Sequence, residues 1–401
     1  MKSDFNSWKW KIFWGVSLTY GAFYFCRFNI SVALPEIGRH FNYSKTVLGG
    51  IGSAFFILYA LGQFVNGQLG DRISPRLLIL TGLIVSSLLN IAFGLSSAVL
   101  AFVILWGING YFQSMGWGPS TKILASWFAL GERGKVSGFM ALFYQMGNVL
   151  SWILAGYLIQ KMGWRWSFFI PAIILLLFGI YFFNRVRNTP QEVGFSPMDD
   201  TKIKSIFKQS IGNPKILRTA ISYFFLSITS YGFLFWLPAH LFSAGNTSIS
   251  IVAFQSGILP FAGAISAVFT GWMSDKLFSS KRVPPSIIML LLSLPLALLF
   301  PNISSIQVKL VVLFFLGFFI YGPHMLMVGA MAMDYGTEKA ASSSAGFIDS
   351  SGYVGATVGG IGIGWLADNY SWNLVFIFCA SCILISCFCL LPMWRHLPES
   401  K

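Results

Sequence analysis

The chain has 401 residues, of which 55% are hydrophobic and only 10% are charged. Soluble domains carry about 25% charged residues, so this composition excludes an ordinary soluble protein and predicts that most of the chain lies in lipid. The net charge of +14 does not indicate nucleic-acid binding, because the basic residues are distributed among the connections between apolar segments.

Apolar segments of membrane-spanning length recur along the whole chain. They lack the alternation of β-barrel strands, so we expect an all-α polytopic membrane protein with twelve transmembrane helices. The expected spans are 12–35, 46–69, 77–97, 99–119, 136–160, 165–186, 217–241, 248–274, 284–301, 304–328, 343–367 and 372–393. The longest polar stretch divides them and predicts a six-helix bundle at 1–186, a linker at 187–216 and a second six-helix bundle at 217–401.

The basic residues indicate how the spans are oriented. If the N-terminus is cytoplasmic, cytoplasmic segments hold 21 of the 27 Lys and Arg residues, outside segments hold five, and Arg27 lies within the membrane. This asymmetry follows the positive-inside rule, so we expect both termini and the linker in the cytoplasm. The short loops favour a bacterial inner membrane, with an organelle membrane as the alternative, and we expect a monomer in the lipid bilayer.

Arg27 lies near the middle of the first expected span. A charge there costs about 3 kcal/mol or more, so it should face a water-filled cavity and bind something. On a helix, Tyr20 and Tyr24 share a face with Arg27, and a guanidinium flanked by phenols suits an oxyanion. The alternatives are an arginine that reaches the lipid headgroups, which its position disfavours, or one paired with a buried carboxylate. We therefore expect Arg27 to bind a small anionic substrate.

Short sequence motifs of the first half recur in the second half at a nearly constant offset. GQLGDR at 67–72 corresponds to GWMSDK at 271–276, and Gly118-Pro119 corresponds to Gly322-Pro323, both at an offset of 204. Two six-helix repeats related by an axis along the membrane normal are the architecture of the major facilitator superfamily, in which substrate binds between the halves.

The connection between the second and third spans resembles the signature motif of that superfamily. We expect the motif residues and their repeat to hold the transporter in one conformation without contacting substrate. Glycine allows close packing of two helices, and the acidic and basic side chains can pair with each other or with helix ends. These latch candidates are Gly67, Asp71, Arg72, Arg76 and Asp275.

Sequence stretches between about residues 14 and 390 resemble the organophosphate:phosphate antiporter family, which includes glycerol-3-phosphate and hexose-phosphate carriers. The stretches are FYFCRFNISVALP, INGYFQSMGWGP, ERGKVSG, TPQEVGF, IYGPHML and AGFIDSSGYVG. The resemblance implies exchange of a phosphate ester for inorganic phosphate by alternating access, with Arg27 as one phosphoryl-binding arginine. It also implies cavity tyrosines, which match Tyr20, Tyr24, Tyr59, Tyr321 and Tyr353.

The chain departs from this family at three basic positions. Ser230 occupies the position of a second arginine, Gln63 that of a basic residue, and Phe143 that of a histidine. We keep Ser230 and Gln63 as candidate site residues. One arginine with neutral donors matches a monoanion, such as a carboxylate, a phosphodiester or a singly charged phosphate, better than a doubly charged monoester.

Polar residues of other spans are further candidates for the cavity wall. They are Asn109 and Gln113, one helical turn apart, and Tyr144 with Gln145 and Asn148. Each of them alone is more often an interhelical hydrogen-bonding residue than a ligand contact.

Asp349 and His324 are titratable residues at similar depths in the second half. Tyr353 follows Asp349 by one helical turn on the same face. Asp349 and His324 are candidates for coupling to a proton, because both can change protonation during a transport cycle. Alternatively, Asp349 binds a cationic group of a zwitterionic substrate, or is a carboxylate satisfied by neighbouring serines.

The leading hypothesis is a secondary active transporter for a small organic anion, with inorganic phosphate or a proton as the coupling ion. The alternatives are a proton-coupled symporter of a carboxylate such as a sugar acid, and a ligand sensor of the same fold. An enzyme is disfavoured because the sequence has no nucleotide-binding loop, metal-ligand cluster or nucleophile–base pair. We therefore expect no metal and no cofactor.

Overall fold

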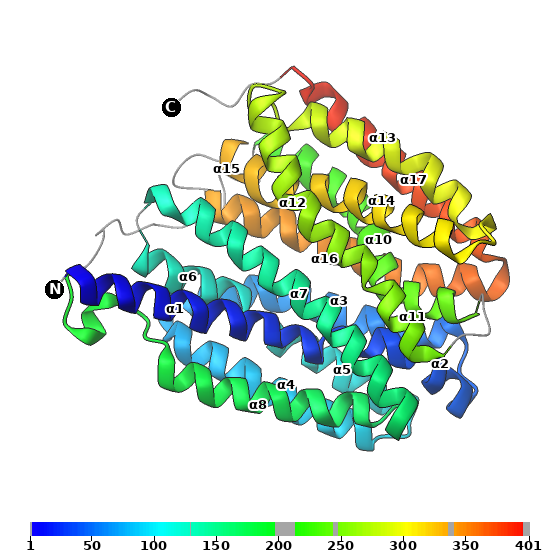
Figure 1. The fold of residues 1–401 in the computed structure, drawn as a ribbon, viewed down its shortest axis with the longest axis horizontal. Coiled ribbons are helices and arrows are strands. Elements are labelled where there is room, and N and C mark those ends of the chain that lie inside the picture. Colours follow the sequence, from blue (N-terminus) through cyan, green and yellow to red (C-terminus); the bar gives the residue numbers. More distant parts are fainter. Residues whose placement is uncertain (1, 129, 197–212, 244–247, 336–340, 396–401) are drawn as a thin grey trace.

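The computed structural model describes residues 2–128, 130–196, 213–243, 248–335 and 341–395 (Figure 1). The N-terminal half comprises helices α1 to α8. These are α1 (Lys2–Phe23), α2 (Asn29–Phe41), α3 (Lys45–Arg72), α4 (Pro75–Leu95), α5 (Val99–Gln113), α6 (Trp117–Trp127), α7 (Leu130–Met162) and α8 (Trp166–Arg185), with 3-10 turns at Tyr24–Cys26 and Pro190–Val193.

The C-terminal half comprises helices α10 to α17. These are α10 (Pro214–Ser243), α11 (Ile249–Ser256), α12 (Ile258–Lys276), α13 (Val283–Leu299), α14 (Ile306–Met325), α15 (Ala332–Tyr335), α16 (Ala341–Asn369) and α17 (Trp372–Leu390). A π-helical turn at Leu326–Met331 joins α14 to α15, and 3-10 turns occupy Phe300–Asn302 and Leu391–Met393.

The predicted all-α membrane fold is confirmed, since each of the twelve expected spans coincides with helical segments. Ten helical stretches in the described residues are long and apolar enough to cross a membrane. The first and eleventh expected spans fall outside these ten. The first is interrupted at Tyr24–Cys26, and its helix α1 begins with charged residues ahead of the expected span. The eleventh is rich in Ser and Gly.

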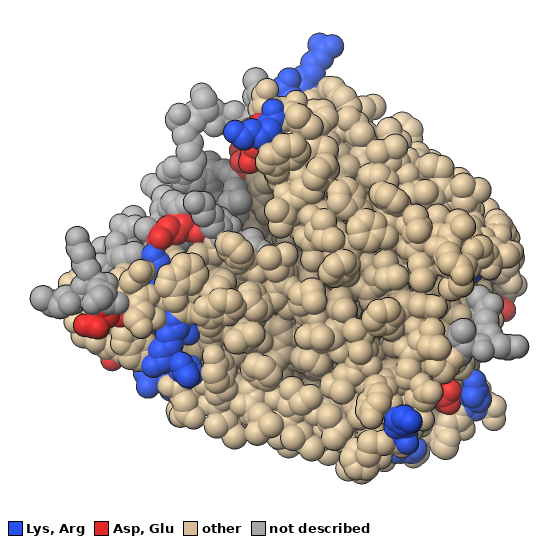
Figure 2. All heavy atoms as spheres, in the orientation of Figure 1, with Lys and Arg blue, Asp and Glu red and all other residues tan. Residues whose placement is uncertain are grey.

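The two halves lie side by side, and the start of α1 and the end of α17 lie at one end of the molecule, here called the terminal end (Figure 1). The opposite end, where α2 ends and α11 begins, is called the far end. Figure 2 shows charged residues at these two ends and a broad face without charges between them. A charge-free belt between two charged ends is the surface expected of a protein that crosses a bilayer.

The two halves are in direct contact at the far end. A Cβ atom on Gly49 of α3 would lie 2.4 Å from the carbonyl oxygen of Gly360 of α16, so glycine is needed for this close approach. Asp368, near the end of α16, accepts hydrogen bonds from the Thr46 backbone N–H at 2.6 Å and from the Thr46 hydroxyl at 2.7 Å. Towards the terminal end, the ribbons of α7 and α12 diverge (Figure 1).

Candidate functional site: a polar cavity between the halves

A cavity lies between the two halves and is lined by residues from both. It offers about 70 Å³ to the centres of water-sized molecules, enough for several waters because about 10–15 Å³ suffices for one. Its lining residues are Tyr20, Tyr24, Phe28, Tyr59, Gln63, Trp117, Tyr144, Gln145, Asn148, Tyr223, Tyr231, Leu234, Tyr321, His324, Met325, Val328, Asp349 and Tyr353.

Most of the predicted site residues meet in this wall. The lining contains the predicted Tyr20, Tyr24, Tyr59, Gln63, Tyr144, Tyr321, Tyr353, Asp349 and His324. Three predicted residues, Arg27, Gln113 and Ser230, are buried just outside the lining, with 3%, 0% and 0% of their surface exposed. The structure therefore brings the tyrosines and the acid to the cavity surface and places the arginine one layer behind it.

A break in the first span determines where Arg27 lies. We expected helical geometry through this segment, but α1 ends at Phe23, and Tyr24–Cys26 forms a 3-10 turn before α2 begins at Asn29. The Cys26 carbonyl oxygen accepts side-chain hydrogen bonds from Asn109 at 2.9 Å and Asn90 at 3.3 Å. Within a membrane, backbone groups freed by a break need such partners. These amides therefore stabilise the break.

The Arg27 guanidinium is held by aromatic rings and neutral acceptors. Its Nε donates to Gln113 Oε1 at 3.1 Å, and its Nη2 donates to the Tyr59 hydroxyl at 3.3 Å. The guanidinium carbon lies 4.4 Å from the centre of the Tyr24 ring and 4.7 Å from that of Tyr59. No carboxylate forms an ion pair with Arg27 among the described residues. Within the described part of the chain, the positive charge therefore has no direct counter-ion.

A chain of hydrogen bonds connects Arg27 to Asp349 across the interface between the halves. The Tyr59 hydroxyl, which accepts from Arg27, also accepts from Gln63 Nε2 at 3.2 Å. The same amide nitrogen lies 3.5 Å from Asp349 Oδ2 and donates to it. One cation of the N-terminal half and one anion of the C-terminal half are thus separated by two neutral side chains.

The C-terminal wall is aromatic around the acid. The Tyr223 hydroxyl and His324 Nε2 are 2.9 Å apart and share a hydrogen bond. The Tyr353 ring lies 5.1 Å from that of Tyr231 and 4.2 Å from that of Tyr59, measured between ring centres. Our sequence analysis missed Tyr223 and Tyr231. Their spacing of eight residues on α10 places them on one helix face and was the available signal.

Ser230 does not replace the missing arginine with another charge. Its side chain is fully buried, and its hydroxyl has no hydrogen-bond partner among the residues the structure describes. Its carbonyl oxygen accepts a 2.8 Å hydrogen bond from the Tyr321 hydroxyl. At this position, the helix presents backbone rather than a cationic side chain to its neighbour.

Residues 16–360 match the Major Facilitator Superfamily. A probable hexose phosphate transport protein of Chlamydia muridarum is 31% identical, and the match covers 100% of this chain and 94% of the relative. The chain belongs to the Major Facilitator Superfamily. These similarities are to transport proteins rather than to enzymes, so the prediction that the protein is not an enzyme is confirmed.

Further relatives confirm the resemblance to the organophosphate:phosphate antiporter family. A glycerol-3-phosphate transporter of Bacillus subtilis is 29% identical, over 96% of this chain and 92% of the relative. The membrane sensor protein UhpC of Escherichia coli is 28% identical, over 97% of this chain and 92% of the relative. The fold is also shared by a bacterial homologue of the human lysosomal transporter Spinster, which was solved in an inward-facing, occupied conformation. The TM-score is 0.83 at 14% sequence identity, and the match covers 97% of this chain and 98% of that structure.

The signature motif of this superfamily is only partly visible. The surroundings of Gly67 and the side chains of Asp71 and Arg72 lie outside the described part of the structure. Arg76 donates to the carbonyl oxygen of Phe183 near the end of α8. Its guanidinium carbon lies 4.2 Å from the centre of the Phe183 ring. The latch role of these residues stays a prediction.

The repeated motif in the C-terminal half forms an ion-pair cluster. Arg282 Nε donates to Asp334 Oδ2 at 2.8 Å, and the same guanidinium donates to Asp275. Burial by itself lowers the pKa of Arg282, but the hydrogen bonds and negative charges of Asp334 and Asp275 outweigh it and raise the pKa above its usual value. We missed Arg282, which follows Lys276 of the repeated motif by six residues.

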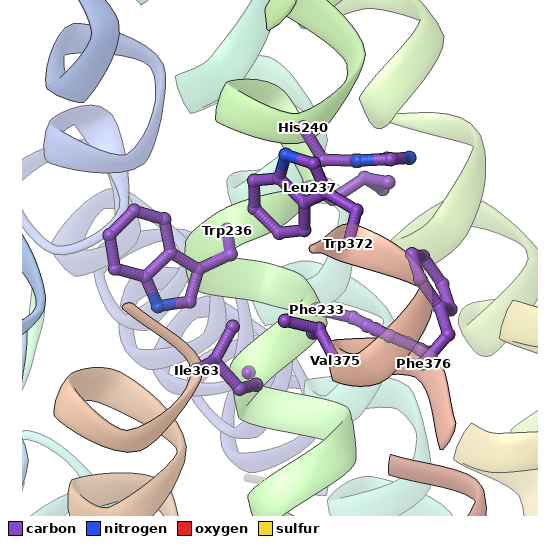
Figure 3. Close-up of a pocket in the computed structure, with 9 residues that line it drawn as sticks. Phe233, Trp236, Leu237, His240, Ile363, Trp372, Val375 and Phe376 are labelled. Atoms are coloured by element: carbon purple, nitrogen blue, oxygen red, sulfur yellow. The ribbon is translucent and has the colours of Figure 1, made fainter. Parts of the chain in front are cut away.

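A second, smaller cavity lies inside the C-terminal half, between α10, α16 and α17 (Figure 3). It offers about 10 Å³ to the centres of water-sized molecules, which is room for about one water. Its lining consists of Gly232, Phe233, Trp236, Leu237, His240, Ile363, Trp372, Val375 and Phe376. Its size and apolar wall make it a gap in the packing rather than a site for the predicted substrate.

Proposed function

We propose that the protein is a secondary active transporter that carries an organic phosphate ester across a bacterial inner membrane by alternating access. Both termini are cytoplasmic in this proposal, and the six-helix bundles at 1–186 and 217–401 rock about the central cavity. The observation that carries the proposal is the buried Arg27 guanidinium beside the interbundle cavity, without a counter-ion among the described residues.

Two further observations support a phosphate group as the recognised part of the substrate. The relatives named as transporters act on hexose phosphate and on glycerol 3-phosphate, which share only the phosphate ester and a polyol character. A guanidinium offers several N–H donors in a plane, which suits phosphate oxygens. Arg27 Nε and Nη2 use neutral acceptors that a phosphate can replace.

Alternating access is supported by the asymmetry of the contacts between the halves. Hydrogen bonds such as those from Thr46 to Asp368 and from Ser53 to the Thr357 carbonyl join the halves at the far end. Gln63 and Asp349 join them at the level of the cavity. In the proposed cycle, opening the far end requires these bonds to break while the terminal end closes.

The test is exchange in proteoliposomes loaded with inorganic phosphate. We expect external labelled glucose 6-phosphate, glycerol 3-phosphate or another phosphate ester to exchange with the internal phosphate. Arg27→Ala should lower the rate at least 100-fold, because the loss of two charged hydrogen bonds is worth about 3 kcal/mol or more. Arg39→Ala is the matched control, since Arg39 is exposed at the end of α2 and pairs with Glu36 at 3.4 Å.

Exchange by the Arg27→Ala protein at the parental rate would contradict the anion-binding role. The named sensor among the relatives supports a second candidate function, ligand sensing without transport. A sensor would bind phosphate esters, as seen by thermal stabilisation, and would exchange none of them.

A further inference from the structure

We propose that the substrate is a zwitterionic phosphate ester, in which Arg27 binds the phosphate and Asp349, with the surrounding tyrosines, binds an amine or quaternary ammonium group. This proposal rests on the proposed function and assigns the other end of the same substrate. It uses the acid and the tyrosines of the C-terminal half, which binding of a phosphate alone leaves without a role.

The charges of the cavity favour a ligand with no net charge. Asp349 is the one acidic side chain in the described lining, no Lys or Arg lines it, and Arg27 lies directly behind Tyr24 and Tyr59. With both groups ionised, the wall sums to zero. A phosphate monoester would add up to two negative charges to a poorly solvated space, which is costly without counter-charges. A zwitterion leaves the sum unchanged.

The position of Asp349 suits a cation-binding site. Among the described residues, the carboxylate receives one side-chain hydrogen bond, at the long distance of 3.5 Å from Gln63 Nε2. Tyr353 lies one turn along α16 from Asp349, and its ring packs between those of Tyr59 and Tyr231. Aromatic faces beside a carboxylate are the environment that binds ammonium groups, quaternary ones in particular.

The separation of the two charges suits one small molecule. The path from Arg27 through the Tyr59 hydroxyl and Gln63 to Asp349 consists of three hydrogen bonds of 3.3, 3.2 and 3.5 Å. These neutral groups occupy the space between the charges. A phosphodiester with a two-carbon arm to its cation can contact both ends and replace the long Gln63 contact with a direct ion pair.

The test compares two ligands that differ only in charge. The first is glycerophosphocholine, and the second is its carbon isostere, the 3,3-dimethylbutyl ester of glycerol 3-phosphate, in which carbon replaces the quaternary nitrogen. Both carry the same singly charged phosphodiester. Binding to the purified full-length protein is measured by thermal stabilisation and by competition with exchange. We expect the isostere to bind at least about tenfold more weakly.

Variants then assign the preference to the acid. Asp349→Asn should bring the two affinities to within about twofold of each other. Tyr353→Leu serves as a second variant and should lower the preference in the same direction. Glu36→Gln, an acid-to-amide change at the far end, should keep the tenfold preference, because Glu36 pairs with Arg39 away from the cavity.

The failures of the two proposals are distinguishable. Equal binding of the ligand and its isostere to the parental protein, together with exchange of glucose 6-phosphate, would overturn the zwitterion and leave the phosphate-ester transporter standing. A preference that survives unchanged in both Asp349→Asn and Tyr353→Leu would overturn the assigned site. Absence of binding and exchange for every phosphate ester and for inorganic phosphate would overturn both proposals.

Discussion

The first span of the N-terminal half and its counterpart in the C-terminal half, α10, differ in both continuity and charge. The first span is interrupted at Tyr24–Cys26 and carries Arg27 beside the break. Helix α10 runs without interruption from Pro214 to Ser243, and the matching position is Ser230. The break exposes backbone carbonyl groups, which side-chain amides of α4 and α5 satisfy.

The comparison shows that the two related walls of the cavity carry ionisable groups of opposite charge. The N-terminal wall contributes a guanidinium that is surrounded by neutral acceptors. The C-terminal wall contributes Asp349, an imidazole and several phenols. A site with two arginines binds a doubly charged group, whereas this pair of walls presents one charge of each sign. Three substitutions, in order of expected effect, test this comparison: two act on the walls and one acts on the break in the first span.

Gln63→Lys should have the largest effect, because it adds a positive charge that neutralises Asp349 of the C-terminal wall. An ammonium at this position lies within reach of Asp349, since Gln63 Nε2 is 3.5 Å away, and would pair with it. We expect exchange of glycerophosphocholine to fall about tenfold and that of glucose 6-phosphate to rise, because the cavity gains a positive charge. Gln63→Met is the neutral control. A rise for both substrates would contradict this account.

Asp349→Asn should change the pH profile by a few-fold rather than abolish exchange. Protonation of Asp349 removes the charge that attracts a cation, so we expect exchange of the zwitterion to fall towards acidic pH in the parental protein. The variant should show a flatter profile between about pH 5 and 8. Proton symport predicts the opposite sign, with faster uptake at acidic outside pH, and an unchanged slope in the variant would remove Asp349 from the mechanism.

Asn109→Ala should have the smallest effect. It removes the 2.9 Å hydrogen bond to the Cys26 carbonyl, while Asn90 and Gln113 still donate to the same oxygen. We expect a loss of about 1 kcal/mol, seen as a melting temperature a few degrees lower, and roughly threefold slower exchange. Asn369→Ala is the control, because the Asn369 side chain, at an exposed site, donates to the Trp365 carbonyl oxygen of its own helix. A melting temperature equal to that of the parental protein would show that the break does not depend on Asn109.

Some of the candidate site was predictable from the residues and some was not. Asp349 was found because an ionisable residue in an otherwise apolar span is energetically costly and therefore marks a candidate functional site. Tyr353 was found because it follows Asp349 by one helical turn. The break at Tyr24–Cys26 could not be found, because no proline or glycine marks it. Its donors, Asn90 and Asn109, are 64 and 83 residues away from Cys26 in sequence.

The amino-acid sequence by itself determined the membrane-spanning helices, the repeat and the presence of one buried cation, because hydropathy and periodicity are local properties of the chain. Only the tertiary structure decided that Arg27 lies behind the tyrosines and that Gln63 bridges the two halves from Tyr59 to Asp349. These arrangements depend on contacts between distant helices, whose hydrogen-bonding groups must pair in a medium with little water.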